Sequence, residues 1–340
     1  MPGTTVDRVD SMDEGLQAVL PLARLDRPDH DRTVVAFGPA VPWGSWQWVG
    51  EETVRELPRY FVATRYALGE VPEADVIVVV KHLPPPSFFD RIPPRSAILY
   101  CPVDYYGDAS QIDQDGALLR RCCRIVVHCE RLRKYFSPYA PVVYMDHPVR
   151  FITTDLVEYR TEGYVLWVGV WSNLPPLVQW VNAHPLPCQL KVLTNLDDLQ
   201  AYQTPADLGF CDVGAVSVEQ WSEERHRELT LRAMAALDIK GDDFRARHKP
   251  PAKGIDFITS GLPLAMNPQS STAEHLARMG FEVVSPSDAN RWFSREYWEE
   301  TRSFGQALRE LLSRRRIGLR YKRLIEEVLA ERRAAGGLLR

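Results

Sequence analysis

Short, continuous apolar runs recur along the first half of the chain, and polar segments separate them. The runs are rich in β-branched residues and lie at 33–37, 61–64, 75–80, 96–101, 124–129 and 141–145. The run at 76–80 is apolar at every position, which indicates a strand covered on both faces. Such strands are typical of a parallel sheet between helices, so residues 31–149 are predicted to form one doubly wound α/β domain.

A second series of apolar runs follows a polar, charged segment at 150–163, which is predicted to be a linker. Strands are expected at 164–169, 189–193, 212–217, 236–239, 262–266 and 282–285, with helices at 176–183, 222–235, 253–260 and 271–279. Residues 164–294 therefore predict a second Rossmann-like domain. The expected fold class is α/β, with two such domains facing a cleft.

The two ends of the chain complete this organisation. Residues 1–30 form an N-terminal extension, in which Ser11 and Glu14 predict the capping box of a short helix. Residues 295–340 carry leucines and isoleucines at helical spacing and are expected to be helices that pack back across both domains.

Composition narrows the class of protein. A chain of 340 residues with 45% hydrophobic and 25% charged residues suits two globular domains, and the sequence contains no apolar stretch long enough for a membrane span. The net charge of −4 argues against bulk binding of nucleic acid. The polar start and the six scattered cysteines, with no CxxC, predict a cytoplasmic protein without a secretory signal or a zinc site.

Positive charge is concentrated at the C-terminus. From Thr301 to Arg340 there are eleven Lys or Arg residues and four Asp or Glu residues. This basic tail predicts peripheral contact with an anionic membrane or a lipid-linked acceptor. A solvated helix face with ion pairs is the alternative interpretation.

The stretch 248–265, HKPPAKGIDFITSGLPLA, carries the clearest chemical signal. Its prolines stop any preceding helix, a helix of two turns follows, and Gly261 ends it. Lys249 and Lys253 beside the helix N-terminus concentrate positive potential, which suits a pyrophosphate. Asp256 lies one turn later and can accept hydrogen bonds from ribose hydroxyls.

This stretch resembles the donor-site segment of GT-B glycosyltransferases, especially the family-4-like bacterial ones. In that family a Lys precedes an acidic residue five positions before Gly-x-Pro, and here these positions are Lys253, Asp256, Gly261 and Pro263. The resemblance implies GT-B architecture, a ribose contact by Asp256 and diphosphate contacts by Lys253 or Lys249. Gly169 ends a segment that resembles the first strand and loop of the donor domain.

The chain departs from the family pattern at three places. His248 occupies the position of the first of two family acids, which makes it a further candidate at the donor site. The loop 169–175 lacks the family's Arg and Lys, and the loop 38–44 replaces a Gly-Gly turn. These departures leave open whether the sugar configuration is retained and whether activity has been lost.

Candidate residues for proton transfer lie where strands of the first domain end. Asp104 follows the run 96–101, in a segment that resembles the family's strand-and-acid motif, and His82 follows the run 75–80. Both should line the ligand edge of a doubly wound sheet. His147 is a further candidate at that edge, and the tryptophans of 43–48 could stack on an acceptor ring. Asp113 and Asp115 resemble the metal-binding DxD of the GT-A fold, but they lie in a polar connection, so no metal is expected.

The leading hypothesis is an enzyme that transfers a sugar from a nucleotide diphosphate donor to a glycan, lipid or small-molecule acceptor, without a metal or other cofactor. One alternative is a catalytically degenerate GT-B protein that acts as a partner or regulatory subunit. Another is a sugar-nucleotide epimerase, which needs no acceptor.

Overall fold

The computed structural model of the chain describes residues 33–42, 44–150, 152–196 and 204–337. The expected helix at Ser11, the extension 1–30 and Trp43 lie outside these residues. The described chain forms two compact units. The N-terminal unit contains residues up to Pro148, His248–Pro250 and the chain from Leu312, and the C-terminal unit contains Val149–Arg247 and Pro251–Leu311.

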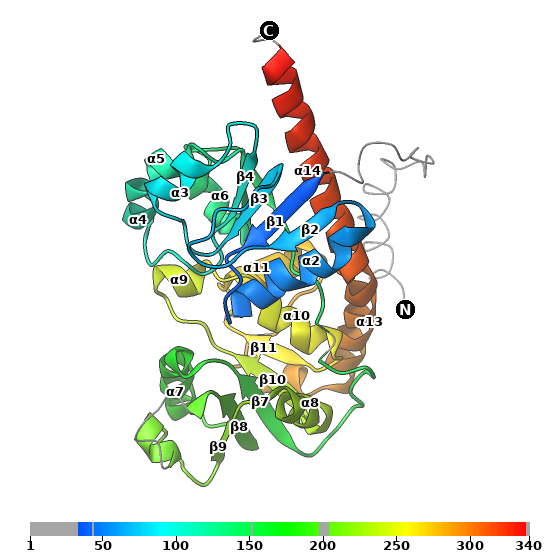
Figure 1. Ribbon diagram of the computed structural model, residues 1–340. Coiled ribbons are helices and arrows are strands. Elements are labelled where there is room, and N and C mark those ends of the chain that lie inside the picture. The colour runs from blue at the N-terminus through cyan, green and yellow to red at the C-terminus, as the bar shows by residue number, and fades with distance from the viewer. Residues whose placement is uncertain (1–32, 43, 151, 197–203, 338–340) are drawn as a thin grey trace. The chain divides into compact units, whose positions relative to one another are not determined.

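The N-terminal unit is built on a parallel sheet of six strands in the order β2-β1-β3-β4-β5-β6 (Figure 1). The strands are β1 Val34–Gly38, β2 Val62–Arg65, β3 Val76–Val80, β4 Ala97–Cys101, β5 Arg124–Val127 and β6 Val142–Tyr144. The two central strands β3 and β4 are buried at every position, as their continuous apolar runs predict, whereas the edge strand β2 is mostly exposed. Its α-helices are α2 Glu52–Glu56, α3 Pro86–Arg91, α4 Ala109–Gln114, α5 Gly116–Leu119, α6 Arg133–Phe136 and α14 Arg314–Gly337.

The C-terminal unit contains a parallel sheet of five strands in the order β11-β10-β7-β8-β9. Its strands are β7 Tyr164–Val168, β8 Gln189–Thr194, β9 Val216–Gln220, β10 Ala235–Asp238 and β11 Leu264–Met266. Its α-helices are α7 Leu174–Ala183, α8 Glu223–Arg232, α9 Phe244–Arg247, α10 Ala252–Thr259, α11 Ser271–Arg278, α12 Ala289–Trp292 and α13 Arg295–Leu311. Two parallel sheets with helices confirm the predicted α/β fold class.

Strand order changes direction once in each sheet. In the C-terminal unit the chain runs from β7 outward to β8 and β9, and then continues on the other side of β7 with β10 and β11. In the N-terminal unit the corresponding change lies between β1 and β3. Ligands of doubly wound sheets bind outside the carboxyl ends of the strands at such switch points. A ligand is therefore expected near the residues that follow β7, β10, β1 and β3.

The helical C-terminal region divides between the two units. The backbone N–H of Arg316 donates to Ser313 Oγ at 3.4 Å, so Ser313 caps the start of α14 and separates it from α13. Helix α13 packs against α10, and its Arg309 guanidinium donates to the carbonyls of Thr153, Thr154 and Thr259. Helix α14 packs in the N-terminal unit, where its Tyr321 is buried.

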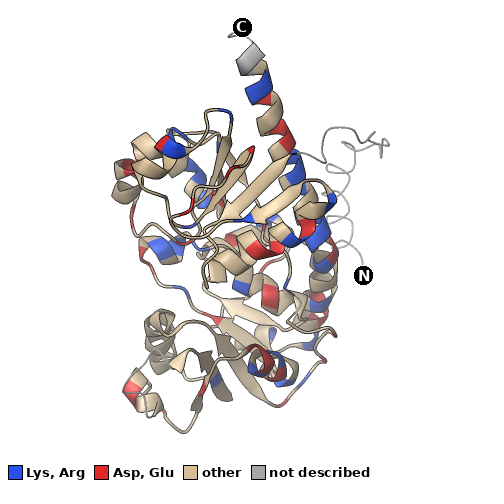
Figure 2. Cartoon of the chain, in the orientation of Figure 1, with Lys and Arg blue, Asp and Glu red and all other residues tan. Residues whose placement is uncertain are grey.

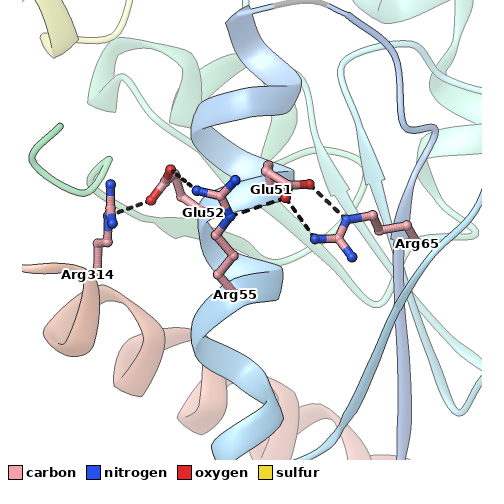
Figure 3. A network of polar contacts seen from close by, with 5 residues as sticks. All are labelled: Glu51, Glu52, Arg55, Arg65 and Arg314. Atoms are coloured by element: carbon pink, nitrogen blue, oxygen red, sulfur yellow. Dashed lines mark hydrogen bonds and ion pairs between the residues drawn. The ribbon is translucent and has the colours of Figure 1, made fainter.

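Ion pairs connect α14 with the strand and helix that precede β3 (Figure 3). Arg314 pairs with Glu52 of α2 at 2.5 Å. Arg55 donates to both Glu52 and Glu51, and Arg65 of β2 donates to both oxygens of Glu51 at 2.7 and 2.8 Å. Because Glu52 is buried, its charge depends on Arg314 and Arg55 for compensation.

Two predicted strands differ from the structure. The segment 282–285 forms only an isolated bridge between Ala265 and Val284. The strand expected from Asp212 begins at Val216, because the Asp212 carboxylate accepts hydrogen bonds from the backbone of Gly214 and Ala215 and closes a turn. No helix in the described part of the chain is both long and apolar enough to cross a membrane.

Candidate functional site

Gly169 and Asp238 lie at the switch point of the C-terminal sheet. Gly169 directly follows β7, and Asp238 ends β10. A Cβ atom on Gly169 would lie 2.9 Å from Lys253 Nζ and 2.7 Å from the Trp167 ring. The missing side chain therefore lets the Lys253 ammonium approach the end of β7 closely.

Lys253 lies in the first turn of α10. Among the described residues no side chain caps this helix start, at which Pro251 is the N-cap residue. Lys253 Nζ lies 3.2 Å from Asp238 Oδ1 and 4.6 Å from the centre of the Trp167 ring. The ammonium and the backbone N–H groups of the first turn together create positive potential at the switch point.

Asp238 holds two lysines at the end of β10. Its carboxylate is 1% exposed, and Lys240 Nζ approaches Oδ2 to 2.7 Å. Burial alone would raise the pKa of Asp238, but Lys240 and Lys253 outweigh it and lower the pKa below its ordinary value. Asp238 is therefore a carboxylate at neutral pH, and it positions both ammonium groups.

Asp256 lies further along α10 and is only 4% exposed. Arg150 Nε donates to its Oδ1 at 3.2 Å, and Arg150 Nη2 donates to its Oδ2. Burial raises the pKa of Asp256, while Arg150 and Lys253 oppose this rise. Both oxygens thus face a guanidinium, and the ribose contact expected for Asp256 stays a prediction.

His226 of α8 is a buried neutral group beside these cations. Its side chain is 5% exposed, and within the described chain its Nε2 has no hydrogen-bond partner. Burial, with the charges of Arg150 and Lys253, lowers the pKa of His226 to about 3. A buried nitrogen in the electrostatic environment of Arg150 and Lys253 therefore lacks a hydrogen-bond partner within the described chain.

Strained backbone marks the carboxyl ends of β3 and β4 in the N-terminal unit. Lys81 follows β3 with φ of 70°, and Asp104 lies just after β4 with φ of 51°. They are the non-glycine residues with positive φ in the described chain, and such strain clusters at functional sites. The structure therefore brings the two proton-transfer candidates, Asp104 and His82, to neighbouring strand ends.

His82 packs on the residue that follows Asp104. The rings of His82 and Tyr105 meet edge to face with centres 4.9 Å apart. Burial, followed by the charge of Lys81, lowers the pKa of His82, which favours a neutral imidazole at physiological pH. A neutral imidazole can accept a proton from a hydroxyl group.

The other candidates have structural partners. His248 and Lys249 belong to the N-terminal unit, where the His248 ring lies 5.3 Å from that of Tyr135. His147 is buried against His128 and Trp48, with ring centres 4.4 and 5.8 Å away. The structure thus groups Gly169, Lys253 and Asp256 in one unit, and His82, Asp104, His147, His248 and Lys249 in the other.

The two aspartates of the DxD-like sequence also serve local structure. Asp113 accepts a hydrogen bond from Tyr139 at 2.5 Å, and Asp115 accepts one from Tyr106 at 2.9 Å. Within the residues that the structure describes, no group of three His, Cys, Asp or Glu side chains is arranged to hold a metal ion.

Sequence reasoning did not single out Arg150 or His226. Arg150 lies in the segment expected to be a linker, 106 positions before its partner Asp256, so no local pattern joins them. His226 is one polar residue among many in α8. An available signal was the absence of Lys and Arg from 169–175, which requires cations at the switch point to come from elsewhere in the chain.

Comparison with known proteins gives structural matches only. No family model matches the sequence, and no curated protein does. AviGT4, a glycosyltransferase of avilamycin A biosynthesis, superposes with a TM-score of 0.59 at 15% identity, over 88% of this chain and 98% of its own. HepE from Anabaena, solved with UDP and glucose, gives a TM-score of 0.58 at 10% identity, over 87% of this chain and 100% of its own.

A third match, TarM, has a TM-score of 0.51 at 11% identity and covers 80% of this chain and 57% of its own. At these identities the similarity establishes architecture and not activity. The two parallel α/β units and these structural matches confirm, at the level of the fold, the resemblance of the sequence to GT-B glycosyltransferases. The chain therefore has the GT-B fold of glycosyltransferases.

Proposed function

We propose that this protein is a glycosyltransferase that uses a nucleotide diphosphate sugar as donor and binds it in the C-terminal unit. The observation that carries the proposal is the convergence of Gly169, Lys253 and the start of α10 at the switch point between β7 and β10. A diphosphate is a ligand that such a charged helix start suits. That HepE was solved with UDP and glucose supports a nucleotide-sugar donor.

In this proposal the leaving diphosphate is stabilised without a metal. Negative charge grows on the diphosphate as the bond to the sugar breaks, and Lys253 with the backbone N–H groups at the start of α10 stabilises it. Lys240 adds positive charge from the end of β10. The sugar acceptor is a hydroxyl group of a glycan, lipid or small molecule.

The acceptor hydroxyl must lose a proton during transfer, and the N-terminal unit supplies two candidate bases. His82 and Asp104 lie at the ends of adjacent strands, and the pKa of His82 is lowered. We assign proton transfer to this pair because each residue sits where a doubly wound sheet exposes side chains to ligands.

Calorimetric titration with UDP, GDP and TDP tests the proposal. The wild type should bind one of them, and Lys253→Ala should weaken that binding by roughly 10- to 100-fold, the usual effect of losing a charge-assisted hydrogen bond. Lys191→Ala, in β8 of the same unit and paired with Glu219, is the matched control and should bind like wild type. No binding of any nucleotide would remove the donor site.

Product analysis separates the enzymatic alternatives. Incubation with donor and an acceptor panel should give a glycosylated product, and His82→Ala should slow its formation without changing donor affinity. A changed sugar nucleotide with donor alone would identify an epimerase instead. Donor binding without turnover, with co-purification of an active transferase, would identify a degenerate partner subunit.

A further inference from the structure

The contact between Arg150 and Asp256 changes which group a ligand meets at α10. The Asp256 side chain is 4% exposed, whereas that of Arg150 is 28% exposed. Arg150 donates to both carboxylate oxygens through Nε and Nη2, which is the bidentate geometry of a guanidinium and a carboxylate. The group accessible from solvent is therefore mainly the cation.

Arg150 also lies in the same electrostatic environment as Lys253. The charges of both residues oppose the rise in the pKa of Asp256, and both charges lower the pKa of His226. Glu223 is exposed at the start of α8, and its negative charge helps to raise the pKa of Arg150. Since the loop 169–175 contains no Lys or Arg, Arg150 brings to this edge a cation that the loop does not provide.

His226 gives an independent indication of a ligand. The residue is only 5% exposed, yet its Nε2 lacks a hydrogen-bond partner in the described chain. Buried polar atoms in native proteins usually have a partner, so this nitrogen, in the electrostatic environment of two cations, is available to a hydrogen-bonding group of a ligand. A phosphate oxygen is such a group.

We propose that Arg150, together with Lys253 and His226, binds the diphosphate of the donor, and that Asp256 positions Arg150 and does not touch the ribose. This assignment rests on the proposed function. A guanidinium held by a carboxylate on one edge is pre-organised, and its planar donors match phosphate oxygens. The short, buried side chain of Asp256 then holds Arg150, the residue that binds the diphosphate, in position.

A double variant can remove the contact between Arg150 and Asp256 without leaving a buried unpaired charge. Arg150→Met alone would strand the Asp256 carboxylate in the interior and destabilise the unit, so the informative protein is the full chain with Arg150→Met and Asp256→Asn. Its thermal melting temperature should stay close to that of the wild type. Arg225→Met with Glu219→Gln, which removes an arginine–glutamate contact of 2.5 Å in the same unit, is the matched control.

Two probes are titrated into each protein: the nucleoside diphosphate that the wild type binds, and inorganic pyrophosphate as its competitor. The affinity of the Arg150/Asp256 double variant should fall at least tenfold for both probes, and the control variant should keep the wild-type affinity for both. Loss of nucleotide binding with unchanged pyrophosphate binding would mean that Asp256 acts on the ribose, and it would overturn the assignment.

Unchanged affinity of the double variant for both probes would also overturn the inference, as would a wild type that binds the nucleotide but not pyrophosphate. Failure of the proposed function looks different. In that case the wild type binds no nucleoside diphosphate, although pyrophosphate still binds in a manner that depends on Arg150.

Discussion

Each unit contains a buried histidine that folding keeps neutral. His128 follows β5, and its Nδ1 lies 2.7 Å from the carbonyl oxygen of Met145. Burial lowers the pKa of His128 to about 4, although the Met145 carbonyl and Asp146 oppose this shift. For His226 burial and two nearby cations lower the pKa to about 3. Neither residue takes up a proton in the folded protein until the solution is strongly acidic.

The linkage between these protons and folding predicts a loss of stability in mild acid. Below pH 6.5 the unfolded chain protonates both histidines, whereas the folded chain resists until about pH 4 for His128 and about pH 3 for His226. Because the unfolded state binds more protons in this window, stability falls as pH falls, by roughly 1.4 kcal/mol per pH unit for each histidine.

Denaturant unfolding at pH 7.5 and pH 5 measures this effect. The decrease in the free energy of unfolding between the two values should be smaller by about 2 kcal/mol in His226→Asn than in the wild type. His184→Asn, which changes an exposed histidine of the same unit, should show the wild-type decrease. An equal decrease in all three proteins would mean that His226 is not held neutral by burial.

At the scale of elements, the apolar pattern predicted the strands because a strand that is buried on both faces is a continuous apolar run without polar positions. Val76–Val80 was placed correctly for that reason. The segment 282–285 has only two valines, between a glutamate and a serine, and only Val284 forms a bridge to β11. The break between α13 and α14 was also missed, because the leucines on both sides continue the helical spacing across Ser313.

The candidate site was predicted where the signal is local and missed where it is not. Lys253 and Gly261 could be placed because prolines and a glycine bound one short helix. His82 and Asp104 could also be placed from a local signal, because each follows a run that predicts a strand. The pairing of Arg150 with Asp256 depends on two segments that meet only in the folded unit, and a single sequence contains no measure of that distance.

The close packing of α13 on α10 leads to a prediction for Gly305. A Cβ atom at this position would lie 2.0 Å from the carbonyl oxygen of Ile258 in α10, and a backbone atom cannot move aside cheaply. Gly305→Ala should therefore destabilise the C-terminal unit by about 1–3 kcal/mol or more. It should also weaken nucleotide binding, since displacement of α10 shifts Lys253.

Thermal melting followed by nucleotide titration checks both effects. Ser303→Ala, at an exposed position two residues earlier in α13, is the matched control and should retain wild-type values. If Gly305→Ala melted at the wild-type temperature, the two helices would not approach as closely as described.

At the scale of the whole chain, the basic C-terminal region is largely engaged in internal contacts. Both cations and acids lie along α14 (Figure 2). Arg314 pairs with Glu52, Arg320 pairs with Asp146 at 2.6 Å, and Lys322 pairs with Glu326 at 2.7 Å. These pairs agree with the ion-paired helix that the sequence offered as an alternative. Peripheral membrane contact stays a prediction that must rest on the remaining exposed cations.

Truncation of the tail cannot test that prediction, because α14 buries Tyr321 and Ile325 in the N-terminal unit and its removal would unfold part of the protein. Charge substitution on the helix surface avoids this problem. Arg315 and Arg333 are exposed, and a basic residue near an anionic membrane contributes about 1 kcal/mol, so Arg315→Gln with Arg333→Gln should weaken binding roughly 30-fold.

Flotation with vesicles that contain anionic lipid is the measurement, with neutral vesicles in parallel. Arg227→Gln with Arg278→Gln removes the same charge from exposed positions of the C-terminal unit, so it should float like wild type if the tail is the contact. Equal flotation of both double variants would assign any attraction to net charge alone, because the same change in the overall field would then have the same effect wherever it is made. Wild-type protein that does not float would leave α14 as a structural helix whose cations serve to compensate buried acids such as Glu52.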